Sequence, residues 1–322
     1  MKRMLSGIKP TGAVHIGNYF GALKQWVEMQ HEYETFIFIP DYHALISVQD
    51  KEQMQELIHN TAIDLLAIGI DPKQVTLYKQ SDVPVHTELC WVFNCRTTMP
   101  QLMRAHAFKD SEAKNKDVSV GLFDYPVLQA ADIVLYDADI VPVGEDQRQH
   151  IEMTREIARK FNNTYGDTFV EPEEMVKAEV GTIVGNDGRK MSKSYANQLP
   201  LFASEEETVE YIKAIPMDSK DIAEYKNPDD YALYQIASLF CTKEQDIELR
   251  AMFSEGGVGY GEIKEHAAKI INDYLRDMRT RRAELENNPE YVQEVLAQGG
   301  ERARTIAQTK MNEVRNKIGF VN

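Results

Sequence analysis

The chain has 322 residues, which suits one large domain or two modest ones. Hydrophobic residues make up 43% of the sequence, enough for a real core, and this excludes a disordered protein. The formal net charge of −15 at pH 7 argues against a general nucleic-acid binder, although it leaves room for a protein that meets one folded RNA through a local basic surface.

The first half of the chain alternates strand and helix patterns. A short strand begins at Met4-Leu5, and the apolar runs 35–39 and 75–78 predict two more strands, the first of them buried on both faces. Helical spacing separates these runs, with apolar residues at Ile16, Phe20, Leu23 and Val27 and then at Met54, Leu57, Ile58, Leu65 and Leu66. The alternation predicts an α/β fold in which a Rossmann-like parallel sheet carries helices on both faces.

The second half changes in texture. Helical stretches are expected at 87–93 and 102–108, followed by a strand over 140–143 and a long helix over 145–161. After Ser194 the apolar positions are helically spaced and acidic residues become frequent. We therefore expect a domain change close to Ser194, with a smaller all-helical domain beyond it.

Cysteine and targeting patterns limit the chemistry. The three cysteines, an odd number, argue against a disulfide framework, and no neighbouring His or Cys completes a four-ligand set, so no structural metal is expected. No apolar run is long enough to cross a bilayer, so no membrane association is expected. The charged residues 1–5 are not followed by the apolar stretch of a secretory signal. A cytoplasmic protein is therefore expected.

Two short motifs, far apart in the chain, carry the chemistry. Lys190-Met191-Ser192-Lys193-Ser194 places two ammonium groups beside small hydroxyls, just after a turn at 186–188. The segment 10–19 contains His15, Gly17 and Asn18 and joins a strand to a helical pattern. The N-terminus of a helix offers free N–H groups and a partial positive charge to an anion. Either motif alone is a weak signal, but together they indicate chemistry on a nucleotide.

In this order, the two motifs resemble the signatures of class I aminoacyl-tRNA synthetases. The segments 7–22, 122–136 and 141–147 are similar to the bacterial tryptophanyl-tRNA synthetases, and the resemblance covers essentially the whole chain. It implies that L-tryptophan is activated with ATP to tryptophanyl-adenylate and then transferred to tRNA(Trp), with release of pyrophosphate and AMP. It also implies magnesium on the ATP phosphates and a homodimer.

The resemblance implies a division of the chain by task. Residues 1–194 would form the catalytic domain that binds ATP and the amino acid. Residues 195–290 would form a helical domain on the anticodon side of the tRNA. Residues 291–322 would form a C-terminal helix that packs back on the catalytic domain.

Both reactants of the first step are anionic, so catalysis must rest on placement and on neutralising the charge that grows on the leaving group. Lys190 and Lys193 suit this task because an ammonium is a compact charge, and His15 would donate a hydrogen bond to phosphate. These three are the expected catalytic residues. The resemblance implies further contacts with ATP, with Asp146 on the ribose hydroxyls and Ile183 on the adenine, from Lys9, Pro10, Thr11, Gly17, Asn18, Gly144, Glu145, Asp146, Ile183, Met191, Ser192 and Ser194.

Asp132 is the expected specificity residue. It lies in an otherwise apolar helical stretch, where a carboxylate is costly unless something donates to it. An indole N–H is a donor with no acceptor function, so a buried carboxylate could select it, and the resemblance implies that role. The alternative is an aspartate that faces solvent or a core arginine. The same pocket would be lined by Leu5, His43, Tyr125, Gln129, Val141, Val143 and Gln147.

Four positions depart from the family pattern, namely Leu5, Lys9, Ser111 and Gln129. Gln129 matters most, because Tyr125, Gln129 and Asp132 together also resemble tyrosyl-tRNA synthetases, which hold a phenol hydroxyl with Gln and Asp. A tyrosine-specific relative therefore stays open as an alternative. Two others are a non-catalytic paralogue that binds tryptophan or a nucleotide, and a small-molecule adenylyltransferase.

Overall fold

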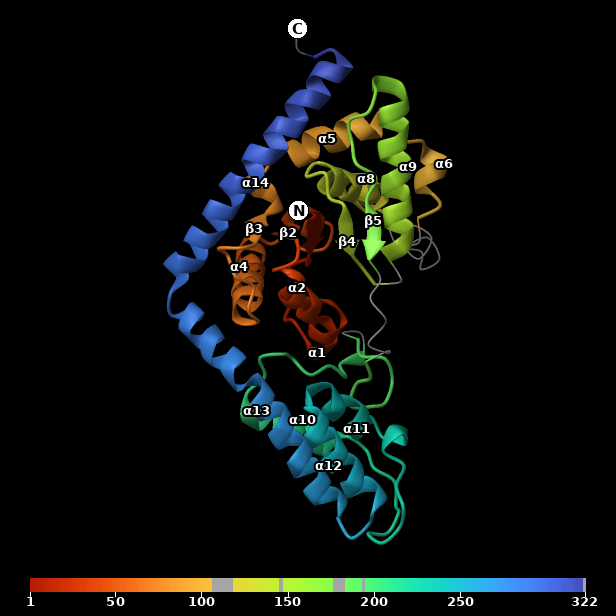
Figure 1. Cartoon of the computed structure of the whole chain (residues 1–322), viewed down its shortest axis with the longest axis vertical. Coiled ribbons are helices and arrows are strands. Elements are labelled where there is room, and N and C mark those ends of the chain that lie inside the picture. Colours follow the sequence, from red (N-terminus) through yellow and green to blue (C-terminus); the bar gives the residue numbers. More distant parts are fainter. Residues whose placement is uncertain (106–117, 145–146, 176–182, 193–194, 321–322) are drawn as a thin grey trace. The chain divides into compact units, whose positions relative to one another are not determined.

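The computed structural model describes residues 1–105, 118–144, 147–175, 183–192 and 195–320 (Figure 1). The chain folds into two compact units. Unit 1 comprises Met1–Gly12, Trp26–Lys177 and Leu285–Asn322, and unit 2 comprises Ala13–Gln25 and Ala178–Glu284.

Unit 1 is built on a five-stranded sheet in which every paired strand is parallel. Its strands lie in the order β3-β2-β1-β4-β5, with β1 at Arg3–Gly7, β2 at Glu34–Ile39, β3 at Thr76–Lys79, β4 at Ile140–Pro142 and β5 at Glu173–Met175. Five of the six residues of β2 are buried, as in a strand covered on both faces. The chain order reverses between β1 and β4, and the carboxyl ends of strands at such a switch point form the usual ligand crevice.

Helices cover both faces of this sheet and confirm the predicted α/β class. They are α3 (Asp41–Ala44), α4 (Lys51–Ala67), the 3-10 turn η2 (Gln80–Asp82), α5 (Val85–Asn94), α6 (Met99–Leu102), α8 (Val120–Val134) and α9 (Arg148–Tyr165). The core between them is rich in aromatic side chains. Phe36 and Tyr136 have ring centroids 5.1 Å apart, and Phe93 and Phe161 have centroids 6.2 Å apart. All four rings belong to one buried core cluster, where they bury a large apolar area.

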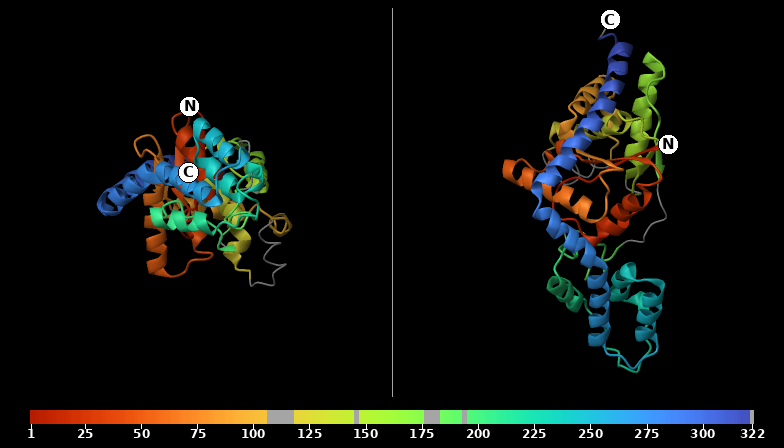
Figure 2. Two further views of the ribbon diagram at one scale, coloured as in Figure 1. Left: turned by 90° about the horizontal axis from the view of Figure 1, so that it is seen from below. Right: turned by 60° about the vertical axis from the view of Figure 1, so that its left-hand side comes forward.

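The long helix α14 (Pro289–Ile318) completes unit 1 and runs along β3 (Figures 1 and 2). At Gly299 the helix backbone approaches the strand so closely that a Cβ atom would lie 1.8 Å from the carbonyl oxygen of Leu77. Two ion pairs fix the rest of the helix: Lys310 lies 2.9 Å from Asp137, and Arg315 pairs with Glu88 at 2.5 Å. Only glycine allows this crossing, because any side chain would have to displace the strand.

Unit 2 is helical. Its elements are α1 (Ile16–Asn18), the π-helix η1 (Tyr19–Leu23), α10 (Glu205–Ala214), η5 (Pro228–Asp230), α11 (Ala232–Ala237), η6 (Ser238–Phe240), α12 (Lys243–Ser254) and α13 (Tyr260–Glu286), the last ending in unit 1. Helix α2 (Lys24–Met29) begins in unit 2 and ends in unit 1. Tyr19, Phe20, Phe240 and Tyr274 form an aromatic cluster, and the hydroxyls of Tyr19 and Tyr274 lie 3.0 Å apart. This cluster holds the segment that starts at Ala13 against the helices that follow residue 178.

Three sequence-based expectations need correction. The helix expected at 102–108 is wrong over 103–105, since α6 already ends at Leu102, and residues 106–108 lie outside the described residues. The helix expected from 145 begins at Arg148, and residues 145–146 are not described. Strand β5 was not expected. The two compact units meet along the chain near residue 178, and residues 13–25 belong to the helical unit. The domain change near Ser194 and the division by task stay predictions.

Candidate active site

The carboxyl edge of the sheet in unit 1 gathers residues from widely separated parts of the chain. Lys9 follows β1, His43 lies on α3 directly after β2, Gln80 begins η2 directly after β3, and Gly144 follows β4. Because the strands are parallel, their carboxyl ends lie at the same edge of the sheet, and the residues that follow the different strands face the same region. Helix α8 supplies the remaining polar group, Asp132.

Asp132 is the centre of a buried polar network. Its side chain is 1% exposed, and three side chains donate to it. Gln80 Nε2 lies 2.7 Å from Oδ1, His86 Nδ1 lies 2.7 Å from the same oxygen, and His43 Nε2 lies 2.9 Å from Oδ2. The alternatives of a solvent-facing aspartate or a core arginine partner are therefore wrong.

These donors keep the carboxyl ionised. Burial by itself raises the pKa of Asp132, but the hydrogen bonds from His43 and His86 and the charges on those rings outweigh it and lower the pKa to about 2. The group is thus a carboxylate at every physiological pH. Asp132 can accept a hydrogen bond from a ligand and has no proton of its own to give.

A second polar chain lies beside the first. Tyr125 donates its hydroxyl to His150 Nε2 at 2.6 Å, and His150 Nδ1 lies 2.9 Å from Gln147 Oε1. The rings of Tyr125 and His43 meet edge to face with centroids 6.2 Å apart. The structure therefore brings together four of the residues expected in the amino-acid pocket, namely His43, Tyr125, Asp132 and Gln147.

The other four residues expected in that pocket are Leu5, Gln129, Val141 and Val143, and three of them lie in or against the apolar core. Leu5 and Val141 are buried in the core of unit 1, and Val143 packs against the same core. Gln129 is half-buried on α8. These positions are compatible with a pocket wall, and their contact with an amino acid stays a prediction.

The residues of the N-terminal motif in unit 2 form a tight turn over 13–18, here called the His15 turn. His15 donates its backbone N–H to Asn18 Oδ1 at 3.1 Å. A Cβ on Gly17 would lie 2.8 Å from His15 Nδ1 and 3.4 Å from the sulfur of Met191. Gly17 therefore leaves room for the imidazole of His15, and its expected contact with ATP stays a prediction.

The second motif lies in the same unit as the His15 turn. Ile16 donates its N–H to the carbonyl of Leu199 at 3.0 Å, and Leu201 donates to the carbonyl of Val14 at 2.9 Å. Together with Met191 beside Gly17, these bonds hold the turn next to the chain that follows the lysines. Two motifs that are far apart in the sequence thus lie close together within unit 2.

Residues 183–192, which include the described part of the lysine motif (190–192), form a short hairpin, here called the lysine loop. Met191 donates to the carbonyl of Ile183 at 2.8 Å, and Lys190 is exposed at its surface. The buried amide of Asn197 closes the loop: its Nδ2 lies 2.7 Å from Asp187 Oδ1 and 3.2 Å from the Lys190 carbonyl, and its Oδ1 accepts the Ser192 N–H at 2.9 Å. The hydrogen bond from Asn197, followed by the bonds from Arg189, lowers the pKa of Asp187 to about 2.

The remaining residues expected at ATP divide into two groups. Lys9, Pro10, Thr11 and Gly144 lie in unit 1 at the carboxyl edge of the sheet, and burial lowers the pKa of Lys9. Glu145, Asp146, Lys193 and Ser194 lie outside the described residues. The roles of all these residues at ATP stay predictions.

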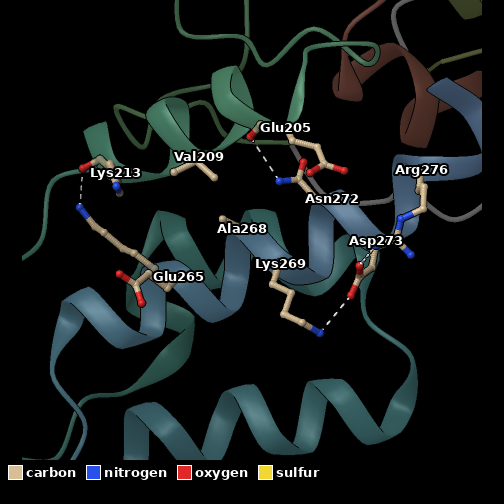
Figure 3. A pocket seen from close by; sticks show the side chains of 10 residues that line it. Glu205, Val209, Lys213, Glu265, Ala268, Lys269, Asn272, Asp273 and Arg276 are labelled. Carbon is tan, nitrogen blue, oxygen red and sulfur yellow. Dashed lines mark hydrogen bonds and ion pairs between the residues drawn. The ribbon is translucent and has the colours of Figure 1, made fainter. Parts of the chain in front are cut away.

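Unit 2 also carries a surface pocket of about 520 Å³ between α10 and α13 (Figure 3). Lys264 donates to the carbonyl oxygens of Lys213 and Ile215 at 2.7 and 2.6 Å, and Lys269 pairs with Asp273 at 3.2 Å. Three of its cations, Lys264, Lys269 and Arg276, are thus engaged by neighbouring acceptors, and a dashed line in Figure 3 marks the pair of Lys269 with Asp273. We assign no ligand to this pocket.

The described residues contain neither a candidate metal-binding cluster nor a candidate membrane-spanning helix. Across the ranges that the structure describes, no three His, Cys, Asp or Glu side chains are grouped so that they could hold a metal ion. Within those same ranges, no helix has both the length and the apolar character needed to span a bilayer.

Sequence reasoning missed several residues of the site. His86 and Gln80 hold Asp132, and Tyr136 in turn holds His86. His150 joins Tyr125 to Gln147, and Asn197 closes the lysine loop. The one available signal was polarity, since Gln80 directly follows a strand at the edge where ligands bind. The other residues sit in helices or loops where a single polar residue is ordinary.

Known proteins match this geometry over the whole chain. The model for class I tRNA synthetases (W and Y) matches residues 1–276. The tryptophan–tRNA ligase of Fusobacterium nucleatum subsp. nucleatum is 45% identical over 322 residues, covering 100% of this chain and 99% of its own, and that of Rhodopirellula baltica is 44% identical over 318 residues, covering 99% of each. The crystal structure of tryptophanyl-tRNA synthetase from Campylobacter jejuni complexed with ADP and tryptophan superposes with a TM-score of 0.93 at 43% identity, covering 98% of this chain and 99% of that one.

A parallel sheet with a switch point is typical of the nucleotide-binding domain of class I synthetases. The chain belongs to the class I tRNA synthetases of tryptophan and tyrosine.

Proposed function

We propose that this chain is a tryptophan–tRNA ligase. It activates L-tryptophan with ATP to tryptophanyl-adenylate, releasing pyrophosphate, and then transfers the aminoacyl group to tRNA(Trp), releasing AMP. The similarity over the full chain to curated tryptophan–tRNA ligases supports this function. The observation that carries this proposal is the buried carboxylate of Asp132. It lies in an apolar helix, and three side chains donate hydrogen bonds to it.

Recognition of the amino acid rests on that carboxylate. The indole N–H donates to Asp132, and Tyr125 and Gln147 line the same pocket. A substrate without this donor leaves the buried carboxylate short of a partner, which is how polar sites reject analogues strongly. The pocket therefore selects tryptophan over phenylalanine by a hydrogen bond and not by size alone.

Activation needs placement and charge neutralisation more than covalent catalysis. The tryptophan carboxylate attacks the α-phosphate of ATP, and negative charge grows on the departing pyrophosphate. Lys190 and Lys193 neutralise that charge, and His15 and Asn18 donate to phosphate oxygens. The shared setting of the His15 turn and the lysine loop within unit 2 supports a joint role at the phosphates. ATP enters as its magnesium complex, so the magnesium ion comes with the substrate.

Three further properties belong to the proposal. The protein acts in the cytoplasm, where tRNA is charged, and residues 195–290 contribute the anticodon-side surface. It works as a homodimer. Support for the dimer comes from large apolar side chains that water reaches: Trp91 is 70% exposed, Met99 59% and Met103 47%. Aromatic and methionine side chains of this kind are enriched at subunit interfaces.

The decisive experiment is ATP–pyrophosphate exchange with tryptophan, tyrosine and phenylalanine in parallel. We expect exchange that depends on tryptophan. Phenylalanine has no donor and should be weaker by at least about two orders of magnitude, as for a site that hydrogen-bonds its substrate. Tyrosine should also be weaker, because its single ring does not place the hydroxyl where the indole N–H lies. Exchange with tyrosine equal to that with tryptophan would refute the tryptophan assignment. For the dimer, light scattering should give twice the chain mass at micromolar concentration, and Trp91→Glu should shift that mass toward the monomer. A monomeric wild type contradicts the dimer alone.

A further inference from the structure

We propose that His86 and Gln80 are positioning residues for tryptophan selection: by saturating one oxygen of Asp132 they leave the other oxygen, Oδ2, as the single acceptor of the indole N–H. The inference rests on the proposed function, because it presupposes that Asp132 meets the indole. It adds which oxygen does so, and which residues decide it.

The two oxygens of Asp132 have different surroundings. Oδ1 accepts from Gln80 Nε2 and from His86 Nδ1, both at 2.7 Å, and a carboxylate oxygen offers about two lone pairs. Oδ2 accepts from His43 Nε2 at 2.9 Å, which leaves it capacity for another donor. The His86 side chain is fully buried, whereas that of His43 is 12% exposed. Oδ2 is therefore the Asp132 oxygen that lies beside the less buried of the two imidazoles and that has room for a further donor.

His86 is fixed in one orientation from both ends. A carboxylate has only acceptors, so ring atom Nδ1 must carry the hydrogen toward Asp132. The other ring nitrogen, Nε2, lies 2.9 Å from the hydroxyl of Tyr136. Burial raises the pKa of Tyr136, so its hydroxyl keeps its proton and can bond to Nε2 as either donor or acceptor. Tyr136 thus holds the His86 ring with Nδ1 directed at Oδ1.

Gln80 is fixed in the same way. Its Oε1 accepts the backbone N–H of Tyr42 at 3.1 Å, so its amide cannot turn over, and Nε2 must point at Asp132. Tyr42 precedes His43 on α3. The next residue, Ser81, donates its backbone N–H to Asp41 Oδ1 at 2.9 Å, and its hydroxyl contacts the other oxygen of Asp41. These bonds tie η2 to α3, so Gln80 fixes Asp132 relative to the helix that carries His43.

A rigid acceptor discriminates more sharply than a mobile one. If Asp132 could rotate, either oxygen could find another donor when the substrate lacks an N–H, and the analogue would lose little. With Oδ1 occupied, the carboxylate cannot make that adjustment, and Oδ2 faces the analogue without a partner. His86 and Gln80 should therefore affect the choice between substrates more than the rate with either one.

The test uses 3-benzothienyl-L-alanine, in which a sulfur atom replaces the indole N–H. The measured quantity is the ratio of kcat/KM for tryptophan to kcat/KM for the analogue in ATP–pyrophosphate exchange. We expect a ratio of about 10² or more in the wild type, as for a site that hydrogen-bonds its substrate. His86→Leu should lower the ratio at least tenfold, and His86→Asn should restore much of it, because the asparagine Nδ2 donates from nearly the position of ring Nδ1.

A matched variant covers the risk that His86→Leu does not fold. Gln80→Met keeps the length of the side chain but removes both the donor to Asp132 and the acceptor of the Tyr42 N–H, and it should also lower the ratio about tenfold. If the folded variants slow both substrates equally, so that the ratio stays at the wild-type value, the residues are merely structural and the proposal is overturned. A wild-type ratio near one, with normal activity on tryptophan, overturns the indole contact itself. Absence of exchange with either amino acid instead counts against the proposed function.

Discussion

Replacing Asn197 by alanine should disable the lysine loop without touching the amino-acid pocket. The buried amide of Asn197 makes three hydrogen bonds to the loop, at Asp187, Lys190 and Ser192. Its backbone carbonyl also accepts the hydroxyl of Tyr211 at 2.8 Å, and alanine keeps that bond. The substitution therefore removes the closure of the loop and leaves the chain path intact.

The magnitude follows from the bonds that are lost. A hydrogen bond in a protein contributes about 1 kcal/mol net, so three of them contribute about 3 kcal/mol to the closed loop. Because about 1.4 kcal/mol corresponds to a factor of ten, kcat/KM for ATP should fall by about 10²-fold. KM for tryptophan should change by less than about threefold, since Asp132 and its donors lie in unit 1 and are untouched.

The assay is ATP–pyrophosphate exchange, measured against ATP at saturating tryptophan and then against tryptophan at saturating ATP. Gln198→Ala is a matched control, because it removes a neighbouring amide whose Oε1 has no hydrogen-bond partner among the residues that the structure describes. The control should retain the wild-type kcat/KM for ATP within about twofold. The role of Asn197 in closing the lysine loop is refuted if kcat/KM for ATP of Asn197→Ala also stays within threefold of the wild-type value. An increase in KM for tryptophan as large as that in KM for ATP would refute it as well.

Three other substitutions test the remaining parts of the argument. Asp132→Asn should raise KM for tryptophan by about 10²-fold and leave KM for ATP nearly unchanged, and equal effects on both would indicate a structural aspartate. The pKa of Asp132 is lowered from 3.8 to about 2, so its negative charge stabilises the fold above pH 4. This contribution is lost as the pH falls from 4 to 2. Urea unfolding should therefore show that the free energy of unfolding of the wild type falls toward that of Asp132→Asn across this range. Lys193→Ala should lower the exchange rate by about two orders of magnitude, and an unchanged rate would refute its role at the leaving group. Gly299→Ala places a methyl group against the Leu77 carbonyl and should lower the free energy of unfolding by about 1–3 kcal/mol or more; an unchanged urea midpoint would mean that α14 can move off β3 at no cost.

Much of the fold could be predicted because it depends on local patterns. The run 35–39 is apolar at every position but one, so it reads as a buried strand wherever it lies, and the structure places β2 there. Strand β5 could not be found this way, since Glu173 and Glu174 are polar and the strand exists only because β4 pairs with it at the edge of the sheet. The end of α6 at Leu102 was also missed, although a proline at its start was a usable signal.

The same contrast between local sequence patterns and tertiary contacts applies to the site. The two motifs and the unusual position of Asp132 could be recognised in the sequence, because paired lysines, a glycine at a turn and a carboxylate in an apolar helix are visible without coordinates. Only the tertiary structure decided that His86 and Gln80 share one oxygen of Asp132, and that Asn197 closes the lysine loop. The physical reason is that a hydrogen bond depends on distance and direction between atoms, and parallel strands bring together residues that the sequence separates by dozens of positions.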